Sequence, residues 1–143
     1  MNWKEEATEK LRKYDAMRLA TENLPEELRR LEQDACAIRS ARPDSISIRG
    51  GLIRDDRLLN NLVHREELNN ALDQARCWVS VTNRALGALD PEEKLILHRL
   101  YICPERKGLE RLCGELDVEQ STIYRKRDQA LRRFTIALYG ITN

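Results

Sequence analysis

Apolar residues in the first part of the chain recur in alternating steps of three and four. The series runs from residue 14 to residue 38 and consists of Tyr14, Met17, Thr21, Leu24, Leu28, Leu31, Ala35 and Ile38. This spacing predicts a helical seam of the coiled-coil type, within one helix or two in tandem over residues 3–41. Pro25 lies inside the seam and removes a backbone donor, so we expect a kink or a new helix start near Leu24.

A second stretch with the same rhythm covers residues 58–89. Its apolar positions are Leu68, Leu72, Ala75, Val79, Thr82, Leu86 and Leu89. Between the two stretches, Pro43 and the Gly50-Gly51 pair predict a loop over residues 42–57, with a strand-like alternation from Ser45 to Ile48. The two helices can fold back as an antiparallel hairpin, or each can pair with another chain, and the pattern fits both arrangements.

A strong helix start follows at residue 90. Asp90 is suited to the N-cap, Pro91 to the first helical position, and Glu92 and Glu93 to the first turn. The apolar positions Leu95, Ile96, Leu97, Leu100 and Tyr101 continue this helix, which we expect to end near Cys103-Pro104.

The segment from Leu109 to Phe134 has the pattern of a helix-turn-helix. The short first helix carries Leu109, Leu112, Cys113 and Leu116 and is interrupted at Asp117-Val118. A longer helix begins near Gln120, with Ile123, Ala130, Leu131 and Phe134 at helical spacing. We therefore predict an all-α chain in which residues 1–89 form a helical arm and residues 90–143 a three-helix helix-turn-helix domain.

Charge distribution strengthens the DNA-binding interpretation. The chain of 143 residues is 34% charged and 5% aromatic, with a formal net charge of +1. Residues 120–139 nevertheless hold five basic residues and one acid. A local basic patch on a nearly neutral chain is typical of a protein that binds DNA with one module and assembles through another.

The second helix of the pair supplies the candidate DNA contacts. Base-edge contacts are expected from Gln120, Ser121, Tyr124 and Arg125, since Arg recognises guanine and Gln recognises adenine in the major groove. Phosphate contacts are expected from Lys107, Arg111, Thr122, Lys126, Arg127, Arg132 and Arg133. A solvated face, or a face packed on the coiled coil, would produce the same pattern.

Other chemistry finds little support in the residues. The four cysteines (Cys36, Cys77, Cys103, Cys113) form no CxxC pair, and His64 and His98 stand alone. We expect no catalytic residue, no metal site and no cofactor, and therefore no enzyme. The chain has no apolar leader and no run of 18 apolar residues, which predicts a cytoplasmic protein in the bacterial host, associated with the nucleoid, rather than a membrane protein.

Two resemblances follow from these residues. The segment Leu112-Cys113-Gly114-Glu115-Leu116-Asp117-Val118, followed by Glu119 and Thr122-Ile123, resembles region 4 of bacterial sigma factors and related response-regulator output domains. The whole layout, with heptad helices before this segment, is similar to the ArpU/RinA-like phage transcriptional regulators. That resemblance implies a regulator of phage late or packaging genes.

The motif departs from its usual form at three positions. Cys113 replaces a small Ala, Asp117 stands where Gly commonly takes the turn, and Glu119 replaces the usual Ser N-cap. A buried thiol is tolerated in place of Ala, Asp can adopt the left-handed conformation at some cost, and Glu119 weakens the helix start.

The resulting functional hypothesis is a sequence-specific regulator of phage or prophage genes. Its expected partners are double-stranded DNA, a second copy of the chain in a homo-oligomer, with a dimer favoured, and RNA polymerase. Two alternatives remain open. A packaging component such as a small terminase subunit would form a ring of many copies, and a coiled-coil adaptor would show no salt-dependent DNA binding.

Overall fold

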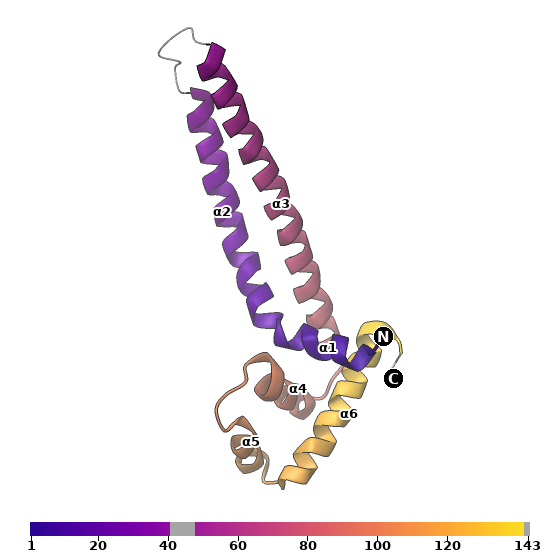
Figure 1. Cartoon of the computed structure of the whole chain (residues 1–143). Helices are drawn as coiled ribbons and strands as arrows, with labels where there is room; N and C mark the ends of the chain where they lie inside the picture. The colour runs from indigo at the N-terminus through magenta and orange to yellow at the C-terminus, as the bar shows by residue number, and fades with distance from the viewer. Residues whose placement is uncertain (41–47, 142–143) are drawn as a thin grey trace. The chain divides into compact units, whose positions relative to one another are not determined.

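The computed structural model describes residues 1–40 and 48–141, and every regular element in these residues is helical (Figure 1). The α-helices are α1 (Trp3–Arg12), α2 (Tyr14–Ser40), α3 (Ile48–Gly87), α4 (Pro91–Leu97), α5 (Gly108–Leu116) and α6 (Gln120–Tyr139). One π-helical turn, η1 (His98–Ile102), continues α4. The all-α prediction is therefore confirmed over the described residues.

The described chain divides into two units. One unit joins residues 1–18 to residues 77–143, and the other consists of residues 19–76. We describe them separately and call them the terminal unit and the hairpin unit. The expected domain boundary between residues 89 and 90 stays a prediction, because it concerns independent folding, but the packing groups the chain differently.

In the hairpin unit, the heptad seam of α2 packs against α3. Leu31 and Ala35 of α2 and Leu72 of α3 are buried. Asn61, also buried on α3, donates from Nδ2 to the carbonyl oxygen of Leu31 at 2.9 Å. Its amide oxygen accepts a hydrogen bond from Arg65 at 2.8 Å, so both polar ends of this buried amide are satisfied.

The interruption of the first helical stretch lies at Lys13 and not at Pro25. Lys13 separates α1 from α2, with φ −90° and ψ −3°, whereas α2 runs through Pro25 without a new start. Helical backbone hydrogen bonds continue on both sides of Lys13. Its N–H donates to Glu9 O at 3.1 Å, and Met17 N donates to Lys13 O at 2.9 Å. Of the two expectations near Leu24, the new helix start was wrong, and the kink at Pro25 within α2 stays a prediction.

The second long helix begins ten residues earlier than residue 58. Residues 48–57, predicted as part of a loop, form the first turns of α3 in spite of two glycines. Arg54 in this stretch donates from Nη2 to Arg39 O, a carbonyl in the last turn of α2 that has no partner within its own helix. This tertiary contact offsets part of the helix cost of the two glycines, which is about 1 kcal/mol per residue. The other residues of the expected loop and strand, 42–47, lie outside the described range.

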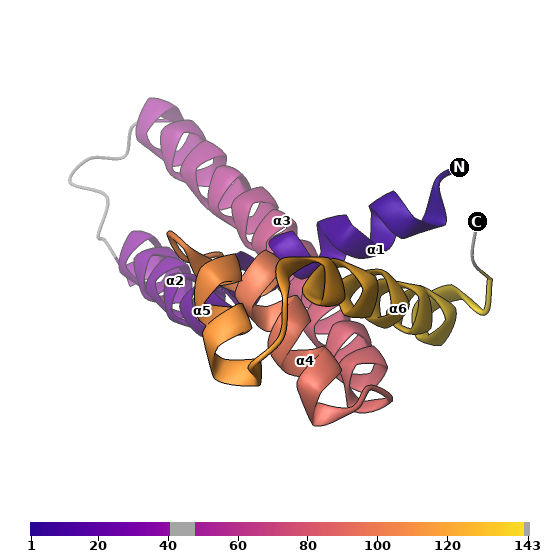
Figure 2. The same cartoon turned by 90° about the horizontal axis from the view of Figure 1, so that it is seen from below.

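The terminal unit is built around α6. Its larger core cluster joins Ala7 and Leu11 of α1 to Ala130, Leu131 and Phe134 of α6. The end of α3 and the α4–η1 helix complete this cluster through Ala85, Leu89, Leu97 and Ile102. Figure 2 shows α1 beside the C-terminal part of α6. The first twelve residues therefore belong to the core around α6 and not to the hairpin.

Both tryptophans hold α1 in place. The Trp3 and Tyr139 ring centroids lie 4.9 Å apart. Trp78, near the end of α3, donates from its indole nitrogen to Lys10 O at 3.1 Å, and the Lys10 ammonium lies 4.1 Å from the centre of the Trp78 ring. These contacts agree with the general preference of tryptophan for anchoring roles.

Candidate nucleic-acid interface

The helix that precedes the candidate site begins as its sequence predicts. Asp90 is the N-cap of α4, Pro91 occupies the first helical position, and a capping box links Asp90 to Glu93. The backbone N–H of Asp90 donates to Glu93 Oε1 at 3.2 Å. Glu93 is buried, which places a carboxylate at the start of α4 on the side that packs against α6.

The next helix, α5, begins at a close approach between two backbone segments. A Cβ atom built on Gly108 would lie 3.3 Å from Arg99 O, so glycine allows α5 to pack tightly on η1. Lys107 before it has φ +63°. Arg99 also donates to Glu115 of α5 at 3.1 Å. These contacts fix α5 against the helix that precedes it.

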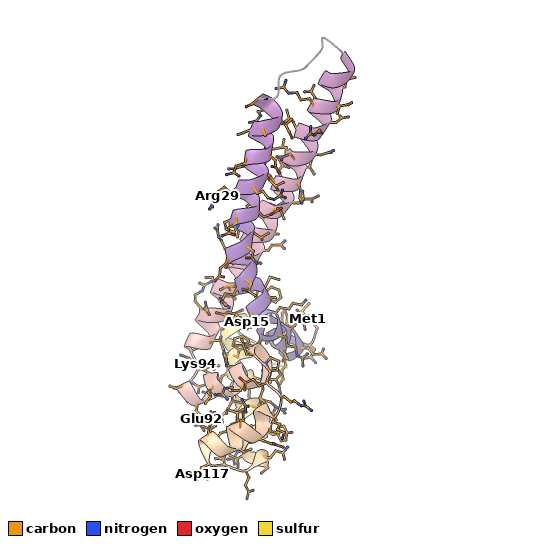
Figure 3. All side chains as sticks on the ribbon, turned by 90° about the vertical axis from the view of Figure 1, so that its left-hand side faces the viewer. Met1, Asp15, Arg29, Glu92, Lys94 and Asp117 are labelled. Carbon is orange, nitrogen blue, oxygen red and sulfur yellow. The ribbon has the colours of Figure 1, made fainter. Side chains whose placement is uncertain are left out.

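The turn between α5 and α6 uses the left-handed residue expected at position 117. Asp117 has φ +53° and ψ +49° and forms the C-cap of α5. The backbone N–H groups of Asp117 and Val118 both donate to Cys113 O. Asp117 lies at one end of the terminal unit, away from Asp15 at the start of α2 (Figure 3). The two helices are therefore joined by a short, hydrogen-bonded turn.

Helix α6 begins at Gln120, as predicted. Glu119 is its N-cap, with extended backbone and no capping hydrogen bond from its side chain, in line with the expected weak start. A second core cluster holds α4, α5 and the first turns of α6 together through buried Ile96, Leu112 and Ile123. The half-buried Cys113 packs on this cluster.

The four candidate base-contact residues are all exposed. Gln120, Ser121, Tyr124 and Arg125 lie in the first two turns of α6. Gln120 Nε2 donates to Tyr124 Oη at 3.2 Å, and the Arg127 guanidinium lies 4.9 Å from the Tyr124 ring centre. Arg125 makes no hydrogen bond or ion pair with any described residue. Its charge is available to a ligand.

Two of the candidate phosphate-contact residues form ion pairs with acidic residues of α4. Lys126 forms an ion pair with Glu92, which Figure 3 labels on α4. Arg133 donates from Nη1 to Glu93 Oε1 at 2.6 Å and lies 3.4 Å from Asp90 Oδ2. The structure thus brings these two cations to the acidic start of α4, a pairing over 34 and 40 residues that no local pattern indicates.

The remaining members of that set differ in their surroundings. Arg111 pairs with Glu105 at 2.7 Å, and Arg127 pairs with its neighbour Asp128 at 3.0 Å. Thr122 is half-buried in the first turn of α6. Lys107 and Arg132 are exposed and form no ion pair within residues 1–40 and 48–141.

A single exposed face of α6 collects the available polar groups. Positions four and seven apart lie on one side of a helix, which places Ser121, Arg125 and Arg132 together, opposite the buried Ile123 and Ala130. Gln129, also exposed, lies on the same face and was not among the sequence-predicted contacts. Because it follows Arg125 by four positions, the helical spacing could have predicted Gln129 as a further contact.

Other kinds of site are not formed by the described residues. In residues 1–40 and 48–141, no group of three or more His, Cys, Asp or Glu side chains is arranged to hold a metal ion. No helix in the described part of the chain is sufficiently long and apolar to cross a membrane.

One cysteine of the terminal unit has a specific partner. Cys103, just after η1, donates from Sγ to Asp15 Oδ2 at 2.8 Å. This hydrogen bond, together with burial and the Asp15 charge, raises the pKa of the Cys103 thiol. The contact fixes the start of α2 to the end of η1 and favours the protonated thiol, which is the less reactive form.

Comparison of the chain with models of protein families, with curated proteins and with solved structures gave no match. Function is therefore inferred from the residues and their arrangement.

Proposed function

We propose that the chain is a sequence-specific DNA-binding protein that inserts the first turns of α6 into the major groove. The observation that carries the proposal is the exposed face of α6, on which Arg125 and Arg132 have no acidic partner among the described residues. An unpaired guanidinium on a rigid helix is the commonest means of reading guanine from the major groove.

The arrangement around this face supports a helix-turn-helix. α5 and the start of α6 share the core cluster around Leu112 and Ile123, and the turn at Asp117 joins them. In this motif the second helix enters the groove while the first crosses the backbone. Lys107, exposed at the start of α5, is then placed to contact phosphate.

Within this proposal, the cations of α6 have two different roles. Arg125 and Arg132, together with Ser121 and Gln129 on the same face, contact the DNA. Lys126 and Arg133 are positioning residues that hold α6 against the start of α4 through their ion pairs. The proposed interface is therefore narrower than the whole basic cluster.

The biological setting that we propose is transcriptional regulation of phage or prophage genes. Its support is the resemblance of residues 112–123 to sigma region 4 and of the whole layout to the ArpU/RinA-like regulators. No enzymatic activity forms part of this proposal, and the partner is double-stranded DNA.

Selection from a random duplex library tests the proposal. The full-length protein is incubated with duplexes that carry a randomised segment, and the bound fraction is sequenced. We expect one motif to be enriched, and Arg125→Ala to relax the preference at one position of it, with a loss of about 1–3 kcal/mol in specific binding. Arg29→Ala, at an exposed arginine of α2 that is outside the proposed DNA contacts, serves as the control and should retain the motif.

Failure to enrich any sequence would contradict specific recognition. Native mass spectrometry of the same sample separates regulator from packaging component, because a ring of many copies would indicate the latter and a small oligomer or monomer the regulator.

A further inference from the structure

Large apolar side chains are concentrated on an exposed stretch of α3. Of the ten large hydrophobic residues that are exposed in the described chain, five lie within twelve positions: Leu52, Ile53, Leu59, Leu62 and Val63. Their exposed fractions range from 44% to 61%. Single exposed apolar residues are ordinary on protein surfaces, but a group on one helix marks a contact surface.

Leu52, Leu59 and Val63 of this group face away from α2, whereas Ile53 lies closer to the α2 side. The side of α3 that contacts α2 is marked by Asn61 and Arg54, which are seven residues apart and bond to backbone carbonyls of α2. Leu59 and Val63 each lie two positions from Asn61, about 160° around the helix at 100° per residue. Leu52 shares their direction, since it precedes Leu59 by seven residues. We call Leu52, Leu59 and Val63, with Leu62 at one edge, the outer stripe.

Acidic side chains border the outer stripe on both sides. Asp55, Glu66 and Asp73 lie along one edge, and Asp56 and Glu67 lie along the other. All five are exposed, and none forms an ion pair within the described parts of the chain. The surface is therefore an apolar strip with negative charge at both margins.

The charge at these margins decides between possible occupants. Pairing the outer stripe with the same stripe of a second copy would bring two rows of unpaired carboxylates together, which is unfavourable. DNA would be repelled for the same reason. A helix with one apolar face and Lys or Arg beside that face would bury the leucines and neutralise both margins.

We propose that the outer stripe of α3 is the docking site for a basic amphipathic helix of a partner protein. The site lies in the hairpin unit, uses none of the residues assigned to DNA contact, and does not depend on the proposed function. The heptad seam of α2 is not available for the same purpose, because Leu31 and Ala35 are buried in the hairpin unit.

Synthetic peptides test the docking site on the full-length chain. The probe is a helical peptide of about 21 residues with leucine at the a and d heptad positions and Lys or Arg at e and g. The control peptide carries Glu at e and g and is otherwise identical. We expect the basic peptide to bind, with an affinity that falls as salt rises, and the acidic peptide to bind at least about tenfold more weakly.

Variants of the protein locate the binding. Leu59→Gln with Val63→Gln should weaken the basic peptide about tenfold or more, whereas Leu19→Gln on α2, another exposed leucine, should change its affinity less than about twofold. Asp55→Asn with Glu66→Gln should flatten the salt dependence, and Glu32→Gln on α2 should not. All of these side chains are exposed, so helix content by circular dichroism should be unchanged.

Three results would overturn the proposal: equal binding of the two peptides, no effect of the Leu59/Val63 variant, or a dimer in sedimentation that this variant dissociates. The last result would assign the stripe to a second copy of the chain. None of these results affects the selection of DNA duplexes from the random library, which tests α6. The two proposals can therefore fail independently.

Discussion

Arg133 of α6 donates a hydrogen bond to Glu93 of α4 over 2.6 Å, and this pair joins α6, the helix proposed to contact DNA, to the capping box of α4. Glu93 is buried, and its second oxygen, Oε2, has no hydrogen-bond partner among the described residues. The positive charge and the hydrogen bond of Arg133 therefore offset a large part of the cost of burying the Glu93 carboxylate. The adjacent residue, Arg132, is exposed and forms no such pair.

The two adjacent arginines should respond differently to the same substitution. Arg133→Gln is expected to lower the free energy of unfolding by about 1–3 kcal/mol, because it leaves a buried carboxylate without its charged donor. Arg132→Gln should change stability by less than about 0.5 kcal/mol. Urea denaturation followed by circular dichroism measures both, and equal losses would show that the Glu93 pair contributes nothing particular.

The packing of α1 predicts that the first residues are needed for the fold around α6. Leu11 is fully buried in the cluster that contains Phe134. Leu11→Ala should lower the free energy of unfolding by about 2–5 kcal/mol, the usual range for truncating a buried leucine. Leu19→Ala, at an exposed position of α2, is the control and should cost less than about 1 kcal/mol.

A fragment of residues 88–143 extends the same prediction. It lacks Ala7, Leu11 and Ala85, which line one side of the core of the terminal unit. We expect it to lose cooperative thermal unfolding, whereas the full chain retains it. A fragment with a sharp transition at the full-length midpoint would show that α1 is dispensable.

The left-handed turn residue offers a stabilising substitution. Asp117 has φ +53°, a conformation that costs an L-residue about 1 kcal/mol and costs glycine nothing. Asp117→Gly should therefore raise the free energy of unfolding by about 0.5–1 kcal/mol. Glu110→Gly, inside α5, should lower it by about 1 kcal/mol. Thermal melts of both variants check the sign, and a loss of stability in Asp117→Gly would mean that its side chain contributes more than the strain costs.

The Cys103 thiol should be alkylated only at raised pH. Its hydrogen bond to Asp15 raises the pKa of the thiol in the folded state, so the stability that this bond contributes is present below the ordinary thiol pKa and is lost as pH rises through the folded value. Iodoacetamide labelling, followed by mass spectrometry across a pH series, gives the midpoint. Asp15→Asn should move that midpoint to lower pH, and an unchanged midpoint would rule out the carboxylate as its cause.

The local features of the fold could be predicted from the sequence because they depend on neighbours. The capping residues at Asp90 and Pro91, the turn at Asp117 and the start of α6 at Gln120 each follow from chemistry within four residues. The heptad spacing of α2 likewise predicted which side would be buried.

The remaining features depend on contacts between distant segments. The helical start of α3 uses a contact from Arg54 to the end of α2, and α1 packs on α6 more than a hundred residues away in sequence. The two roles of the α6 cations have the same origin. Lys126 and Arg133 each follow a buried residue, Ile123 and Ala130, by three positions, so the helical pattern places them toward the packed side of α6. It cannot indicate that α4 brings acids to them there.

A salt titration of duplex binding tests the central claim most directly. The full-length protein, the Arg125→Gln/Arg132→Gln variant and the Lys126→Gln/Arg133→Gln variant are compared by fluorescence anisotropy at a temperature where circular dichroism shows all three folded. Each lost cation that neutralises a phosphate should reduce the slope of log affinity against log salt by about 0.9, because it no longer releases a condensed counterion. We predict a slope shallower by up to about 1.8 for Arg125/Arg132 and little change for Lys126/Arg133. An unchanged slope in the Arg125/Arg132 variant would contradict DNA binding through the exposed face of α6.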